Sequence, residues 1–202
     1  MTTRVPRWLP NALSALRIAL VPVWLVLAIA ERARALEGFE VRRLPLLAVL
    51  GVIGLTDVLD GQLARRFGLA SHLGAVLDAV ADKLATLTAV TFLAFFAAPA
   101  FTPLPLWLWA ALLARDAALL IGYLTLRARR RPIDASHLWE GRVATLLLFT
   151  LVVSACAAAP ARWVAAGALG ICALVAAGTW QYLARGLASL RAHGGHHAPL
   201  PP

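Results

Sequence analysis

TDVLDGQLARRFGLASHLGAVLDAVADK, residues 56–83, holds four aspartates inside two segments that are otherwise apolar enough to span a membrane. The aspartates stand at spacings of three and four residues within each segment: Asp57, Asp60, Asp78 and Asp82. An aspartate at the centre of a membrane helix costs roughly 2.5–3.5 kcal/mol on insertion scales. Four of them in one hairpin therefore need compensating cations, and we expect those cations to take part in the chemistry.

The two segments are joined by the short stretch 66–72, so they are predicted to form an antiparallel pair of helices. Asp60 precedes this turn by as many residues as Asp78 follows it, and both should lie roughly 9 Å below it. Helical spacing groups the motif residues on two faces, Asp57, Asp60, Gly61 and Ala64 on one helix and Gly74, Asp78 and Asp82 on the other. If these faces meet, four carboxylates converge just inside the cytoplasmic surface.

Four neighbouring carboxylates repel one another unless cations lie between them. A site with oxygen ligands and without nearby His or Cys favours a hard ion, Mg²⁺ or Mn²⁺. Two such ions about 3.5–4 Å apart can hold a phosphate between them. The small residues Gly61, Ala64 and Gly74 then leave room for a ligand, although small residues in membrane helices are also common packing devices. A cation-transport or proton-relay site is the alternative use of these aspartates.

The composition indicates a membrane protein. Of 202 residues, 61% are hydrophobic and 14% charged, against about 45–50% apolar residues in soluble domains. The formal net charge of +9 comes almost entirely from arginine. These arginines flank hydrophobic segments and form no basic stripe interleaved with aromatic residues. We therefore expect anionic lipid headgroups and phosphorylated substrates as partners, and no nucleic acid.

We predict an all-α, polytopic membrane protein with a single domain over residues 1–190 and a disordered tail at 191–202. An N-terminal interfacial segment around Trp8 should precede the first span. The arginine distribution favours both termini in the cytoplasm, with part of the loop 31–43 as an alternative interfacial helix. The six expected transmembrane helices are 12–30, 44–65, 73–97, 104–126, 143–159 and 163–184.

The aspartate hairpin resembles the signature of the CDP-alcohol phosphotransferase family. The run D-x2-D-G-x2-A-R-x8-G-x3-D-x3-D is matched at every fixed position, from Asp57 to Asp82. The opening PNALSALRIALVP, from Pro10 to Pro22, is similar to the P-N-x-L-[TS]-x2-R-x4-P entry of bacterial members. Together with the six-helix plan, the likeness covers roughly residues 8–184.

This resemblance implies transfer of a substituted phosphate from a CDP-linked donor to an alcohol, with release of CMP. It implies that Asp57, Asp60 and Asp78 hold two divalent cations, and that Asp82 is a further ligand or the general base. It also implies a homodimer, with CDP-diacylglycerol as donor. From the arginine distribution we expect the active site to face the cytoplasm, and we expect a bacterial inner membrane. The positions similar to the family's nucleotide-binding residues are Asp57, Gly61, Ala64, Arg65 and Gly74.

The acceptor is expected to be glycerol 3-phosphate, because the hairpin is most similar to phosphatidylglycerophosphate synthases and cardiolipin synthases within the family. Phosphatidylglycerol and inositol phosphate are the alternative acceptors, and a divalent-cation transporter is the alternative outside enzymes. Arginines inside spans are costly unless they pair or meet a phosphate. Arg115, Arg142 and Arg17 are therefore the candidates for an acceptor-phosphate pocket.

Overall fold

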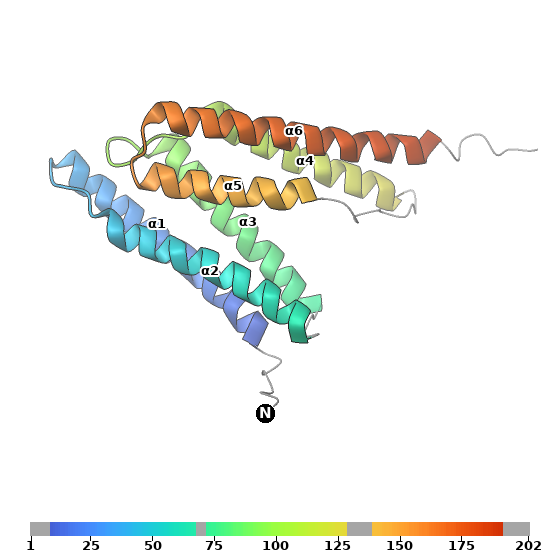
Figure 1. The fold of residues 1–202 in the computed structure, drawn as a ribbon, viewed down its shortest axis with the longest axis horizontal. Coiled ribbons are helices and arrows are strands. Elements are labelled where there is room, and N and C mark those ends of the chain that lie inside the picture. Colours follow the sequence, from blue (N-terminus) through green and yellow to red (C-terminus); the bar gives the residue numbers. More distant parts are fainter. Residues whose placement is uncertain (1–8, 68–71, 129–138, 192–202) are drawn as a thin grey trace, which may run out of the picture. The chain divides into compact units, whose positions relative to one another are not determined.

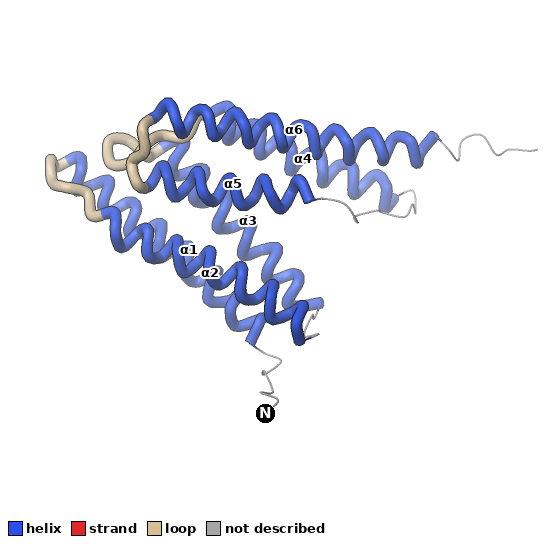
Figure 2. Tube along the Cα trace, in the orientation of Figure 1, coloured by secondary structure: helices blue, strands red, loops and turns tan. Residues whose placement is uncertain are grey.

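The chain is helical throughout the part that its computed structural model describes, which is residues 9–67, 72–128 and 139–191. Figure 2 shows these helices joined by loops, and no strand occurs within those ranges. The six helices are α1 (Leu9–Leu36), α2 (Arg43–Phe67), α3 (His72–Phe95), α4 (Leu106–Ala128), α5 (Trp139–Cys156) and α6 (Ala161–Arg191). The predicted all-α class is confirmed, and a helix lies at each of the six predicted positions. That all six helices cross a membrane stays a prediction.

The first helix is longer than the sequence indicated, because α1 continues into the stretch that was expected to be a polar loop. It ends in a Schellman motif, in which the Phe39 N–H donates to the Arg34 carbonyl over 2.9 Å. Gly38 takes the left-handed conformation that this motif requires, with a φ of 83°. Glu31 stabilises the turn from the side, since its carboxylate accepts the Arg42 backbone N–H over 2.7 Å.

Within the described ranges, three helices are long and apolar enough to cross a membrane by length and composition. They are α1 over Asn11–Leu36, α4 over Leu106–Thr125 and α6 over Ala161–Ala184, and α5 has a shorter apolar part, Val143–Cys156. The expected interfacial segment around Trp8 and residues 192–202 of the expected tail lie outside the described residues. Arg191 ends α6.

The chain divides into two compact units, and the first consists of Met1–Pro105 with Phe149–Ala165. In this unit α1 packs against both α2 and α3, as the blue, cyan and green helices of Figure 1 show. The core between them is aromatic. Trp24 of α1 is 2% exposed and meets the edge of the Phe92 ring of α3, with the ring centroids 5.8 Å apart. Phe92 also packs against Phe101, which follows α3.

The end of α5 belongs to the same unit, and Thr102 contacts it. Thr102, between α3 and α4, donates its hydroxyl to the Ala159 carbonyl over 2.7 Å and its N–H to the Ala155 carbonyl over 3.2 Å. Earlier on α5, the Phe149 ring lies against α2. A Cβ placed on Gly54 would come within 2.7 Å of Phe149 Cζ. Gly54 therefore permits a close approach of the two helices.

The second unit consists of Leu106–Leu148 with Ala166–Pro202. Its helices α4 and α6 are also closely packed, since a Cβ on Gly122 would lie 3.0 Å from Tyr182 Cε1. Several large apolar side chains of this unit are exposed, as expected for helices that face lipid, among them Leu120, Ile121, Leu169 and Trp180.

Candidate active site

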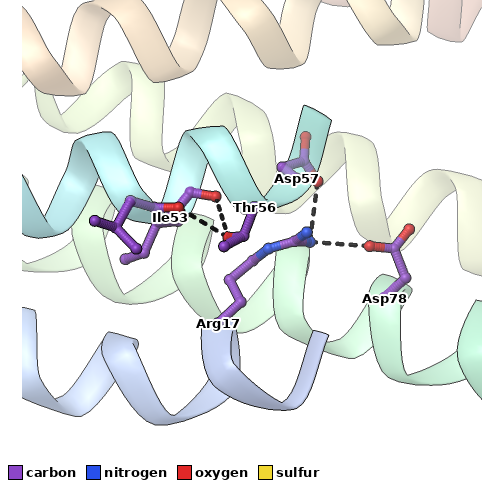
Figure 3. A network of polar contacts seen from close by, with 6 residues as sticks. Arg17, Ile53, Thr56, Asp57 and Asp78 are labelled. Carbon is purple, nitrogen blue, oxygen red and sulfur yellow. Dashed lines mark hydrogen bonds and ion pairs between the residues drawn. The ribbon is translucent and has the colours of Figure 1, made fainter. Parts of the chain in front are cut away.

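Arg17 of α1 joins the two aspartate-bearing helices of the hairpin. Its Nη1 atom lies 2.9 Å from Asp57 Oδ1 of α2 and 2.9 Å from Asp78 Oδ1 of α3 (Figure 3). The two carboxylate oxygens can therefore be no farther apart than the sum of these distances. The structure thus brings together one aspartate from each predicted face, as the hairpin predicted, and places a cationic side chain between them.

The position of Arg17 follows from the apolar pattern of α1. Ser14, Val21 and Trp24 are all buried, and they stand three before, four after and seven after Arg17 in the sequence. This spacing puts them on one stripe of the helix, the stripe that packs against α2 and α3. Arg17 lies in the middle of the stripe, so the burial of its neighbours carries its side chain, 2% exposed, into the helix interface.

The carboxylates differ from the arginine in their access to solvent. The side chains of Asp57 and Asp78 are 51% and 50% exposed, whereas the guanidinium between them is buried. The two acids therefore line an open side of the cluster and Arg17 closes its inner side. An open side is what a substrate or a cation needs in order to approach the carboxylates.

Thr56, which belongs to none of the predicted site positions, fixes the turn of α2 that presents Asp57. It is 5% exposed, and its Oγ1 donates to the carbonyls of Val52 and Ile53 over 2.9 and 2.8 Å (Figure 3). Back-bonding of this kind satisfies a buried threonine hydroxyl inside its own helix. With Thr56 directed inward, the next residue, Asp57, is directed toward the opening.

Asp82 belongs to the same electrostatic cluster. It lies one helical turn after Asp78 on α3, is partly buried, and interacts electrostatically with Asp57, Asp78 and Arg17. Gly74 lies one turn before Asp78 on the same helix. Three of the four predicted acids thus stand close enough to influence one another.

The side chain of Asp60, the fourth predicted acid, lies outside the described residues, and so do those of Ala64, Arg65 and Arg142. Gly61 falls in the same part of α2. Among the side chains that are described, no group of three or more His, Cys, Asp or Glu could by itself hold a metal ion. The predicted metal and nucleotide sites therefore remain predictions at these positions.

The predicted acceptor-phosphate residues occupy different parts of the chain. Arg115 is partly buried on α4 in the second unit, and Arg142 stands on α5 in that unit. Arg17 belongs to the first unit and contacts the aspartates. A signal for this contact with the aspartates was present in the sequence, because an arginine inside an apolar span needs an anionic partner.

Comparison with known proteins places the chain in a family. The family model described as CDP-alcohol phosphatidyltransferase matches residues 7–179. The chain is 39% identical over 126 residues to a cardiolipin synthase (CMP-forming) of Streptomyces coelicolor, an alignment that covers 61% of this chain and 54% of the relative.

Two further relatives carry different names. The chain is 32% identical over 145 residues to a CDP-diacylglycerol–glycerol-3-phosphate 3-phosphatidyltransferase of Aquifex aeolicus, covering 72% of this chain and 73% of the relative. It is 31% identical over 142 residues to a "probable phosphatidylglycerophosphate synthase" of Mycobacterium tuberculosis, covering 69% of this chain and 61% of that protein. The chain thus spans little more than half the length of the Streptomyces relative and more of the Aquifex one.

Proposed function

The chain belongs to the CDP-alcohol phosphatidyltransferase family, and from this we propose that it transfers a phosphatidyl group from CDP-diacylglycerol to an alcohol and releases CMP. The observation that carries the proposal is the convergence of Asp57 of α2 and Asp78 of α3 on the same atom of Arg17. These two acids belong to the eight-position motif on which the family resemblance rests. Their convergence gives the motif a location where a phosphate-bearing substrate can be bound.

The acceptor that we propose is a hydroxyl of a glycerol unit. Glycerol 3-phosphate is the first candidate, because the Aquifex relative named for that acceptor is covered over 73% of its length. Phosphatidylglycerol is the second. The chain is more identical in sequence to the Streptomyces relative named cardiolipin synthase than to the Aquifex relative, but over a shorter alignment. Both acceptors would present an alcohol to the same cytidine-linked donor.

The carboxylates fit two divalent cations, Mg²⁺ or Mn²⁺. Oxygen donors are the ligands these ions prefer, and Asp57 and Asp78 approach a common point from two helices while half-exposed. Asp60 would complete the ligand set, with Asp82 beside it as the base. When bound, the ions would neutralise the phosphate charge that develops as CMP leaves. Gly61, Ala64, Arg65 and Gly74 would hold the nucleotide.

Asp82 would act as the general base. It takes the proton of the acceptor hydroxyl, and the acceptor oxygen forms a bond to the phosphorus that carries the diacylglycerol. The bond between that phosphorus and the oxygen leading to the cytidine phosphate breaks, and CMP leaves with the electron pair. Proton removal of this kind contributes typically 10²–10⁴-fold to a rate. Asp82 is partly buried and lies one helical turn from Asp78. This position suits a carboxylate that stands beside the two aspartates bridged by Arg17.

We also propose that all six helices cross a bacterial inner membrane as a single domain and homodimer, with both termini and the site on the cytoplasmic side. The apolar stretches of α1, α4 and α6 support three of these spans directly. The ion pairs of Arg17 lower the cost of placing the α2–α3 hairpin in lipid, because a paired charge is less costly there than a single one.

The decisive experiment measures CMP release by the purified chain from CDP-diacylglycerol, with each candidate acceptor added separately. Asp82→Asn should lose at least 100-fold in turnover while Mn²⁺ binding persists. Glu37→Gln, which alters an exposed carboxylate after α1, should release CMP at the unmodified rate. Folded protein that binds Mn²⁺, moves it across liposome membranes and releases no CMP with any acceptor would favour the transporter instead.

A further inference from the structure

The bridge between Asp57 and Asp78 is made by a single atom, Nη1 of Arg17, which contacts one oxygen of each carboxylate. One positive charge therefore faces two negative charges. The Arg17 side chain is buried away from solvent, whereas the side chains of both acids are about half-exposed. A buried guanidinium is costly unless it is paired. The burial of Arg17 therefore depends on its contacts with the two aspartates.

We propose that Arg17 is a built-in counter-ion, a positioning residue that holds Asp57 and Asp78 together when no divalent cation is bound. The cation and the guanidinium then compete for the same two carboxylate oxygens. This inference rests on the proposed function in one respect, because it takes the two acids to be ligands of a divalent cation. It assigns to Arg17 a different task from binding an acceptor phosphate.

The geometry supports competition because both positive partners would contact the same carboxylate oxygens. Arg17 reaches the carboxylates from the buried interface of α1, and the exposed sides of Asp57 and Asp78 remain open to a cation from solvent. A divalent cation on the contacted oxygens would lie close to the guanidinium, and like charges at that distance repel. Either the guanidinium withdraws or the cation binds more weakly than it would without the arginine.

The arrangement also has a structural use, which the same contacts explain. Without a cation, Asp57 and Asp78 would repel each other and separate α2 from α3. Arg17 removes that repulsion and joins both helices to α1, so the site keeps its shape before the metal and substrate arrive. A preformed site avoids the cost of gathering its ligands at the moment of binding.

The test compares the unmodified chain with Arg17→Gln at one pH, with EDTA and with Mn²⁺. Arg17→Gln should lower Tm in EDTA on the order of 5 °C, and Mn²⁺ should restore most of the loss. The shift in Tm caused by Mn²⁺ should thus be larger in the variant than in the unmodified chain. Mn²⁺ binding, followed by electron paramagnetic resonance, should be several-fold tighter in the variant.

Two further variants separate the counter-ion role from simple packing. Arg17→Gln combined with Asp78→Asn removes one carboxylate as well as the guanidinium. In EDTA this double variant should have a higher Tm than Arg17→Gln alone. This comparison holds even if Arg17→Gln unfolds in EDTA, because recovery is the measured quantity. Arg162→Gln is the matched control, since that arginine lies over the Trp163 ring with its Cζ atom 5.7 Å from the ring centroid, remote in the sequence from the aspartates. It should change neither quantity.

Equal Mn²⁺-induced shifts and equal Mn²⁺ affinities in the unmodified chain and in Arg17→Gln would overturn the inference. A loss of Tm that neither Mn²⁺ nor Asp78→Asn restores would overturn it too, because packing would then explain the effect. These measurements do not depend on CMP release. An unmodified chain that binds no Mn²⁺ would overturn the inference and the proposed metal site together, whereas Mn²⁺ binding that Arg17→Gln leaves unchanged would overturn the inference alone.

Discussion

Replacing Gly54 by alanine should destabilise the protein, although alanine is the better helix former. Gly54 lies inside α2, where the Phe149 ring of α5 touches its backbone, and an added Cβ would come 2.7 Å from Phe149 Cζ. Gly51, one turn earlier on the same helix, has nothing within 4 Å of an added Cβ. Gly51→Ala is therefore a matched control that changes the same atoms without the collision.

The magnitude follows from the comparison of the two variants. Each gains about 1 kcal/mol from replacing a helical glycine by alanine, and this gain cancels in the difference. Forcing a methyl group into a filled contact costs about 1–3 kcal/mol. At about 2–4 °C per kcal/mol for a chain of this size, Gly54→Ala should melt on the order of 5 °C below Gly51→Ala.

The assay is thermal unfolding of the purified variants in one detergent, followed by loss of the monodisperse peak or by intrinsic fluorescence. Adding Phe149→Leu to Gly54→Ala should recover part of the loss, since the aromatic ring that the methyl group meets is gone. A Gly54→Ala protein that melts at or above Gly51→Ala would refute the close approach of α2 and α5. Gly54 stands three residues before Asp57, so CMP release should fall in Gly54→Ala as well.

Two other outcomes are expected. Thr102→Val should lower stability by about 1 kcal/mol, because it removes the hydroxyl that donates to the Ala159 carbonyl; Thr125→Val, whose hydroxyl bonds the Ile121 carbonyl of its own helix, is the control and should melt several degrees higher. Removing divalent cations with EDTA should abolish CMP release and adding Mg²⁺ or Mn²⁺ should restore it, whereas full CMP release in EDTA would contradict the role proposed for the aspartates.

The six helices could be predicted from the sequence because apolar runs of sufficient length have few alternatives in a membrane. The C-terminal end of α1 was harder to predict from the sequence. Glu31 and Arg34 looked like loop residues because they are charged, yet they lie within α1 and the helix passes through them. Gly38 was the better signal, since a glycine soon after a charged helical turn commonly marks a Schellman end.

The site was predictable where the signal is local and less so where it depends on distant packing. The spacing of Asp57, Asp78 and Asp82 on two helices joined by a short turn predicts that these acids lie close together if the two faces meet. The contact of Arg17 with Asp57 and Asp78 joins residues as many as 61 positions apart and depends on how α1 packs on both helices. Sequence spacing carries no information on that packing, so this contact could not be predicted from the sequence.

The link from Arg17 to the hairpin has a consequence for biosynthesis. The ribosome completes α1 before α2 and α3 exist, and Asp78 follows Arg17 by 61 residues. In the proposed membrane topology, the first helix would therefore enter the bilayer with a cation whose anionic partners have yet to be synthesised. We expect the translocation machinery to hold α1 until the hairpin emerges, so that the three helices leave its lateral gate together rather than one at a time.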